Sequence, residues 1–137
     1  MNDRQILLIK YSWSYILPQA QQTGQRFYVK LFELSPALQP MFRNDPELQA
    51  RKFIAMMTLL VRRLQHARDL TYELEALSRR HVRYGTQATD YAPVGLALFW
   101  TLSQTLGDRW TGEIQSAWRE LYTAISNAMV TATRQPG

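Results

Sequence analysis

The segment DPELQARKFIAMMTLLVRRLQ, residues 45–65, combines a helix start signal with apolar residues at helical spacing. Aspartate caps helix N-termini, proline suits the first helical position, and Glu47 lies near the positive end of the helix dipole. We therefore expect a helix that begins at Asp45-Pro46 and runs to about Gln65. One face of this helix carries Gln49, Phe53, Met56 and Leu60.

The other long segments show the same period of about 3.6 residues, and none alternates with a period of two over the length of a strand. The sequence therefore predicts an all-α fold. Proline and glycine residues separate the periodic segments and set their ends. The expected helical segments lie at about residues 6–17, 19–34, 35–42, 45–65, 74–85, 90–107 and from 111 onward.

Three of these helices each carry, on an otherwise apolar face, one group that can bind a metal or hydrogen-bond a ligand. The three groups are His81, Gln49 and Tyr28. The face of His81 also contains Leu74, Leu77 and Ser78, and the face of Tyr28 contains Gly24, Leu31 and Phe32. An apolar pocket with a few placed polar atoms is typical of a buried cofactor site.

Length and composition exclude several classes of protein. With 137 residues, of which 46% are hydrophobic, the chain is expected to form one domain over residues 1–137, without room for a second catalytic domain. No apolar run approaches the roughly 20 residues that cross a bilayer, so membrane insertion is not expected. The start MNDRQILLIK does not resemble a secretory signal, which favours a cytoplasmic location. Because cysteine is absent, a metal must be held by His81, His66 or carboxylates, or arrive inside a cofactor.

The net charge of +5 would suit an anionic partner such as nucleic acid, a membrane or the carboxylates of a cofactor. However, the arginines are spread along the chain in ones and twos, and the aromatic residues lie on the apolar stripes. A nucleic-acid-binding protein usually concentrates its basic residues on one face and interleaves exposed aromatic ones. We therefore interpret the charge as a solvated helix surface and expect no nucleic-acid partner.

The alternation of long and short helical segments disfavours a four-helix bundle, which uses helices of matched length. Gly24 and Ala50 are small residues that face inward on two different helices. Small residues are needed where two helix backbones cross closely at a steep angle. These features favour globin-like packing.

The candidate pocket positions recur at characteristic separations. Phe42 follows Tyr28 by fourteen residues, Gln49 follows Phe42 by seven, and Tyr91 follows His81 by ten. This spacing resembles that of bacterial single-domain globins and of the haem domain of flavohaemoglobins. The C-terminal half is also similar to neuroglobin-type globins. The segments that carry the resemblance are FYVKLFELSPALQPMF, ELQARKFIAMM, LSRRHVRYG, YAPVGLALFWTL and AWRELYTA, and together they span essentially the whole chain. The resemblance implies a globin fold, a three-on-three helical sandwich around haem b.

By this resemblance, His81 is the proximal ligand of the haem iron and Phe42 stacks on the porphyrin. Tyr28 and Gln49 form the distal pair. The neutral imidazole of a helical histidine is a common haem ligand. Its other N–H can bond to the carbonyl four residues earlier, here that of Leu77, which fixes the ring and its tautomer.

The resemblance gives supporting roles to four further residues. Phe53 and Val94 would line the cavity, and Lys52 would meet a haem propionate. Tyr91 matches a tyrosine that, in flavohaemoglobins, polarises the proximal histidine together with a glutamate. The stretch that matches this glutamate reads MVTAT, residues 129–133, so the glutamate has no counterpart. The flavin and nicotinamide domains have no counterpart in this sequence either.

The distal pair implies tight binding of dioxygen. Bound dioxygen carries partial negative charge, which a phenol or amide donor stabilises by about 1 to 3 kcal/mol, or roughly tenfold to a hundredfold in dissociation. Bound carbon monoxide is less polar and gains less. The missing glutamate and flavin domain weaken an autonomous redox enzyme. The sequence therefore favours a protein that reversibly binds dioxygen for storage, delivery or sensing, with carbon monoxide and nitric oxide as further ligands.

Two other functions remain open. The same pocket would serve a nitric oxide dioxygenase or a weak peroxidase, provided that an external reductase returns the iron to the ferrous state. A third interpretation, from a different class, is a cofactor-free helical regulator or nucleic-acid-binding module that uses the arginines.

Overall fold

The computed structural model describes residues 1–42, 45–66, 74–80 and 91–134, and all regular structure in these ranges is helical. The α-helices are α1 (Asp3–Ile16), α2 (Ala20–Leu34), α3 (Pro46–Arg63), α5 (Tyr91–Leu106) and α6 (Gly112–Arg134). Residues 74–80 are also α-helical. The short 3₁₀ helices are η1 (Leu17–Gln19), η2 (Pro36–Met41) and η4 (Gly107–Arg109). The prediction of an all-α fold is confirmed for these residues.

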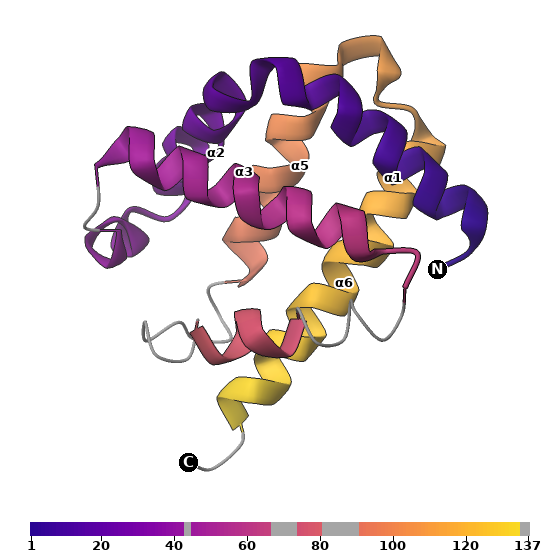
Figure 1. Ribbon diagram of the computed structural model, residues 1–137. Helices are drawn as coiled ribbons and strands as arrows, with labels where there is room; N and C mark the ends of the chain where they lie inside the picture. The colour runs from indigo at the N-terminus through magenta and orange to yellow at the C-terminus, as the bar shows by residue number, and fades with distance from the viewer. Residues whose placement is uncertain (43–44, 67–73, 81–90, 135–137) are drawn as a thin grey trace.

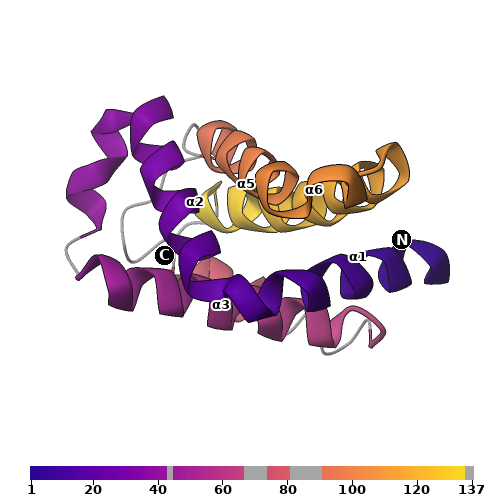
Figure 2. The same cartoon turned by 90° about the horizontal axis from the view of Figure 1, so that it is seen from above.

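The α-helices form two layers with one helix that crosses at their end (Figures 1 and 2). In the view of Figure 2, α5 and α6 lie side by side in one layer, whereas α1 and α3 lie in the other. Helix α2 contacts α3 in one layer and α5 in the other, and α1 packs against α6 across the layers. The interior is therefore enclosed by elements that are far apart in the sequence.

The helix start signals act as the sequence predicts. The Asp45 carboxylate accepts a hydrogen bond from the backbone N–H of Leu48 at 3.4 Å, and α3 begins at Pro46. At the other end, α3 stops at Arg63, two residues before the predicted Gln65. Helix α2 begins at Ala20, because the chain around Pro18 first forms the 3₁₀ turn η1.

Helices α2 and α3 cross at Gly24 and Ala50. A Cβ atom added at Gly24 would lie 2.9 Å from the Ala50 Cβ and 3.0 Å from the Ala50 carbonyl oxygen, closer than real Cβ atoms pack. The predicted close approach of these two backbones is thus confirmed. The residues that flank this crossing, Tyr28 on α2 and Gln49 on α3, are brought to the same side of it.

The predicted apolar stripes of the first and last helices meet in the core. Trp13 of α1 and Trp118 of α6 are buried, with ring centroids 5.9 Å apart. The indole N–H of Trp118 donates to the Ser12 hydroxyl at 2.8 Å, and this hydroxyl donates in turn to the Ile9 carbonyl at 2.9 Å. The one polar atom of this large buried side chain is therefore paired, as buried polar groups generally are.

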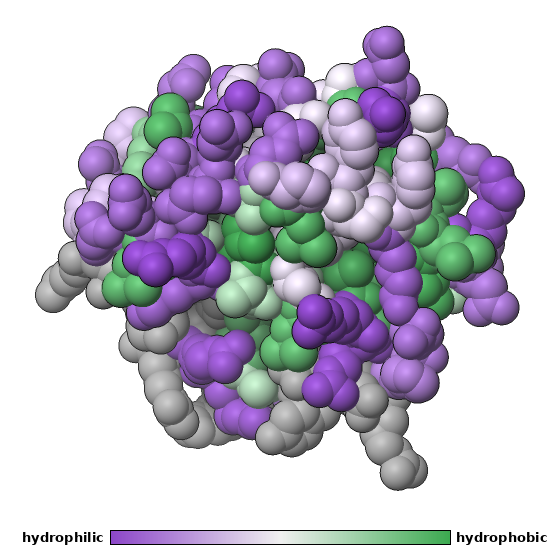
Figure 3. All heavy atoms as spheres, turned by 45° about the horizontal axis from the view of Figure 1, so that its top comes forward, coloured by the Kyte–Doolittle hydropathy of each residue, from purple (hydrophilic) through white to green (hydrophobic). Residues whose placement is uncertain are grey.

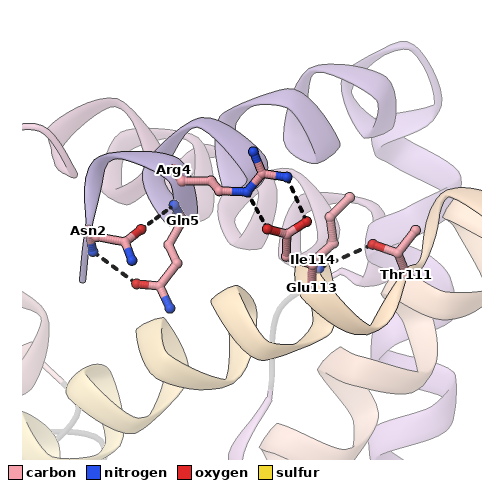
Figure 4. A network of polar contacts seen from close by, with 6 residues as sticks. All are labelled: Asn2, Arg4, Gln5, Thr111, Glu113 and Ile114. Atoms are coloured by element: carbon pink, nitrogen blue, oxygen red, sulfur yellow. Dashed lines mark hydrogen bonds and ion pairs between the residues drawn. The ribbon is translucent and has the colours of Figure 1, made fainter.

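The outer ends of α1 and α6 are joined by exposed polar contacts (Figure 4). Arg4 forms a two-pronged ion pair with Glu113, in which the Nη2–Oε2 distance is 2.9 Å. Asn2 and Gln5 cap the start of α1 reciprocally, and the Thr111 hydroxyl accepts from the backbone N–H of Ile114. Because Arg4 and Glu113 are both exposed, water and salt screen their attraction, and the pair adds little to the stability of the fold.

Polar side chains cover much of the face in Figure 3, and apolar ones show mainly near its centre and at one edge. None of the described helices has the length and apolar character that would let it span a bilayer.

Candidate functional site

Tyr28 of α2 and Gln49 of α3 face each other beside the Gly24–Ala50 crossing. The Gln49 amide Nε2 donates a hydrogen bond to the Tyr28 hydroxyl oxygen at 3.3 Å. Both side chains are half-buried. A separation of 3.3 Å is long for a hydrogen bond to a hydroxyl, so this bond is weak. The Tyr28 hydroxyl can therefore turn to a third partner at little cost from this bond.

Aromatic rings surround the Tyr28 hydroxyphenyl group. Phe42, just after η2, meets the Tyr28 ring edge-on at a centroid distance of 5.3 Å, and Phe53 of α3 does so at 5.9 Å. Phe27 stacks on Phe53 at 4.2 Å with the rings nearly parallel. Phe32 adds a further ring, 5.4 Å from that of Phe42. Three of the predicted pocket residues, Tyr28, Phe42 and Phe53, thus gather at one place with Gln49.

This surrounding keeps the Tyr28 hydroxyl protonated. Burial raises the pKa of Tyr28, and the hydrogen bond from Gln49 lowers the pKa by less. A phenol with a raised pKa is neutral at physiological pH and retains its proton for donation. The site therefore offers a phenol and an amide, two neutral hydrogen-bond donors.

The remaining predicted site residues differ in how exposed their side chains are. Leu77 is buried on the helical segment 74–80, and Val94 of α5 is half-buried. Lys52 of α3 is exposed. His66, the other histidine, is exposed. His81 lies outside the described residues, and its role remains a prediction.

Tyr91 lies at the start of α5, where its side chain is buried. Its backbone carbonyl accepts a hydrogen bond from the Tyr122 hydroxyl of α6. Gly95 makes room for the Tyr122 ring, because a Cβ at this position would lie 2.6 Å from the ring atom Cε1. Burial raises the pKa of Tyr122, and the neighbouring Tyr91 phenol raises the pKa further. Tyr122 is thus a neutral donor that ties α6 to the first turn of α5.

Sequence reasoning missed Phe27 and Tyr122 as residues of this region. Phe27 follows Gly24 by three positions and precedes Leu31 by four, and this spacing could have placed it on the buried face of α2. The signal for Tyr122 is Gly95 inside an otherwise apolar helix, because such a glycine often marks the close approach of another group.

The described residues define an all-helical domain in which two crossing helices hold a neutral phenol and an amide among aromatic rings. The profile of the family described as Globin matches residues 25–129, and the chain belongs to the globin family. Among curated proteins, it is similar to the anaerobic nitrite reductase HBII of Casuarina glauca, with 26% identity over 145 residues, 93% of this chain and 89% of the relative. Among solved structures, it is similar to the hexacoordinated heme protein of an anhydrobiotic tardigrade. The TM-score of that match is 0.86 at 18% identity, over 98% of this chain and 96% of the other.

These findings confirm the predicted globin fold. Membership of the globin family supports haem binding by this chain. The tardigrade protein shares the fold, and at 18% identity the likeness bears on the fold alone.

Proposed function

We propose that this globin holds haem b and reversibly binds dioxygen and other diatomic gases with high affinity, for oxygen binding, transport, storage or sensing. The contact between Tyr28 and Gln49 is the observation that carries the proposal. It places two neutral hydrogen-bond donors in an aromatic surrounding. Haem iron supplies the reversible binding of a gas molecule when the group is bound.

The side chains around this contact suit a large apolar macrocycle with charged edges. We assign Phe42, Phe53, Leu77 and Val94 to the pocket lining. The two phenylalanines lie directly against the Tyr28 ring, and Leu77 is buried. Lys52 is exposed, as befits a cation that meets propionate groups at the solvent edge of a haem.

The Tyr28 hydroxyl would donate a hydrogen bond through its proton to a bound gas molecule. Its raised pKa keeps this proton in place at neutral pH. Gln49 would stabilise the same ligand directly or hold the Tyr28 oxygen in position through its amide. Loss of one such hydrogen bond costs about 1 to 3 kcal/mol, and the aromatic rings around Tyr28 lower the local dielectric, which strengthens the bond.

We expect Tyr28→Phe to accelerate dioxygen dissociation at least ~tenfold, while carbon monoxide release changes much less. Stopped-flow ligand replacement measures both rates. Tyr11→Phe is the matched control, because Tyr11 is 54% exposed, and it should leave both rates unchanged. Equal dioxygen off-rates for Tyr28→Phe and the parent protein would contradict the assignment of Tyr28.

His81 is assigned to the haem iron. We expect His81→Gly to lose the strong absorption band near the blue edge of the visible spectrum, and added imidazole to restore it. His66→Gly is the matched control, because His66 is exposed, and it should keep the band. If both variants retain the spectrum of the parent protein, His81 is not the ligand.

A second candidate function is nitric oxide dioxygenation with a separate reductase. The same donors that hold dioxygen tightly would also polarise it toward reaction with nitric oxide. Stopped-flow mixing of the oxygenated protein with nitric oxide tests this candidate. Rapid formation of ferric protein and nitrate is expected if it is correct, and slow or absent formation would remove it.

A further inference from the structure

A surface hollow of about 350 Å³ lies between α2 and α5, on a different face of α2 from Tyr28. The hollow is lined by Gln22, Gln25, Arg26, Val29 and Trp100. The α2 residues among these recur at intervals of three and four, so they share one face of that helix. The hollow is therefore separate from the proposed gas-binding site, and nothing in that proposal uses it.

Large apolar side chains are exposed in and beside this hollow. Val29 is 67% exposed and Trp100 is 37% exposed. Leu96, one helical turn before Trp100 on α5, is 62% exposed and extends the apolar strip beyond the hollow. Tryptophan and arginine are the residue types that most often dominate the binding energy of protein interfaces. Because the apolar strip continues past the hollow, it fits a protein partner better than a small-molecule ligand. Small molecules usually bury most of their surface in an enclosed site.

The charges at the hollow are positive. Lys30 lies beside it, with its ammonium 4.8 Å from the centroid of the Trp100 ring and 3.5 Å from the Glu33 carboxylate. Among the described residues Arg26 forms no ion pair, and none of the residues that line the hollow is acidic. The cation at the hollow that is open to an incoming carboxylate is therefore Arg26.

We propose that this surface docks a partner protein that presents carboxylates around an apolar or aromatic side chain. The apolar side chain of the partner fills the hollow against Val29 and Trp100. A partner carboxylate pairs with the planar Arg26 guanidinium, which can donate two parallel hydrogen bonds. A second copy of this chain is a poorer occupant, because each copy carries a net charge of +5 and the same cations at this surface.

A titration with two synthetic amphipathic helical peptides tests the proposal. One peptide carries leucines on one face and glutamates on the other, and the second carries lysines in place of the glutamates. Each is added to the full-length ¹⁵N-labelled protein, reduced and saturated with carbon monoxide so that any haem iron is diamagnetic. We expect the glutamate peptide to shift the indole N–H resonance of Trp100, and the lysine peptide to leave it unchanged.

Charge reversal at the hollow gives the matched comparison. Arg26→Glu should weaken binding of the glutamate peptide at least ~tenfold, which corresponds to about 1.4 kcal/mol, and Val29→Asp should act in the same direction. Arg119→Glu makes the same charge reversal on the exposed side of α6. It should change the affinity for the glutamate peptide much less. Far-ultraviolet circular dichroism confirms that each variant is folded.

Three results would overturn the proposal. They are no shift of the Trp100 resonance with the glutamate peptide, equal shifts with both peptides, or equal effects of Arg26→Glu and Arg119→Glu. Sedimentation equilibrium adds a fourth, because a dimer that Val29→Asp abolishes would assign the surface to a second copy of this chain. None of these measurements depends on which gas the protein binds.

Discussion

At the scale of single residues, Gly24 decides how closely two helices approach. Its missing side chain leaves space for Ala50, and a Cβ would come within 3.0 Å of the α3 backbone. This close crossing sets the distance between Tyr28 and Gln49, which lie beside it on the two helices. Gly24, which has no side chain, thus controls the geometry of the candidate site.

We expect Gly24→Ala to lower the free energy of unfolding by about 1 to 3 kcal/mol, because the added methyl group overpacks the crossing. Urea denaturation measures the change. Gly112→Ala is the matched control, since a Cβ at Gly112 would have no heavy atom within 4 Å, and its effect should be small or stabilising. A Gly24→Ala protein as stable as the parent would contradict the close approach.

At the scale of helices, a buried hydrogen bond links α1 to α6. The indole of Trp118 is fully buried and has its N–H paired with the Ser12 hydroxyl. Ser12→Ala removes this acceptor, and a buried donor left unpaired costs about 1 to 3 kcal/mol. We therefore expect a lower urea midpoint for Ser12→Ala.

Ser14→Ala provides the comparison on the same helix. Ser14 is exposed, and its hydroxyl bonds only to the Tyr11 carbonyl in its own helix. Its replacement should stay within about 0.5 kcal/mol of the parent protein. If both serine variants are equally stable, the Trp118 bond is not a significant link between α1 and α6.

Helix α1 begins at Asp3, three residues before its predicted start. The starts of α2, α3 and α6 could be predicted from the sequence, because capping and proline effects act within a few residues. Asp45-Pro46 is the clearest case, and α3 begins where this signal indicates. Partners between helices could not be predicted in the same way. Ser12 and Trp118 are 106 positions apart, and each pattern alone indicates only that its residue faces inward.

For the candidate site, the sequence could predict which helix face each residue occupies. The sequence places Tyr28 and Gln49 on inward faces of two helices, and the structure brings them into contact. The hydrogen bond between Gln49 and Tyr28 depends on how α2 and α3 cross, and no local sequence pattern specifies this crossing. Tyr122 was missed as a neighbour of Tyr91 for the same reason, since their contact joins two helices.

At the scale of the whole molecule, two half-buried phenols link stability to alkaline pH. The pKa values of Tyr28 and Tyr122 are both raised in the folded state. Unfolded tyrosines ionise near pH 10, so above about pH 10 the unfolded chain binds fewer protons than the native protein. The free energy of unfolding should therefore fall as the pH rises through this range, and the contribution is fully present below it.

Urea midpoints measured between about pH 9 and pH 11.5 check this slope. Tyr28→Phe and Tyr122→Phe should each make the decline shallower, because each removes one linked proton. Tyr11→Phe replaces an exposed tyrosine and should keep the slope of the parent protein. The same slope in all four proteins would show that other groups govern the alkaline loss of stability.

The contact between Gly95 and Tyr122 also constrains how this sequence can evolve. With the Tyr122 ring in place, any side chain at position 95 would collide with it, since a single Cβ already comes to 2.6 Å. A smaller residue at position 122 leaves a cavity and removes the hydrogen bond to the Tyr91 carbonyl, which costs stability without a collision. Lineages that descend from this protein should therefore change position 122 before position 95, and a larger residue at 95 should be found only together with a smaller one at 122.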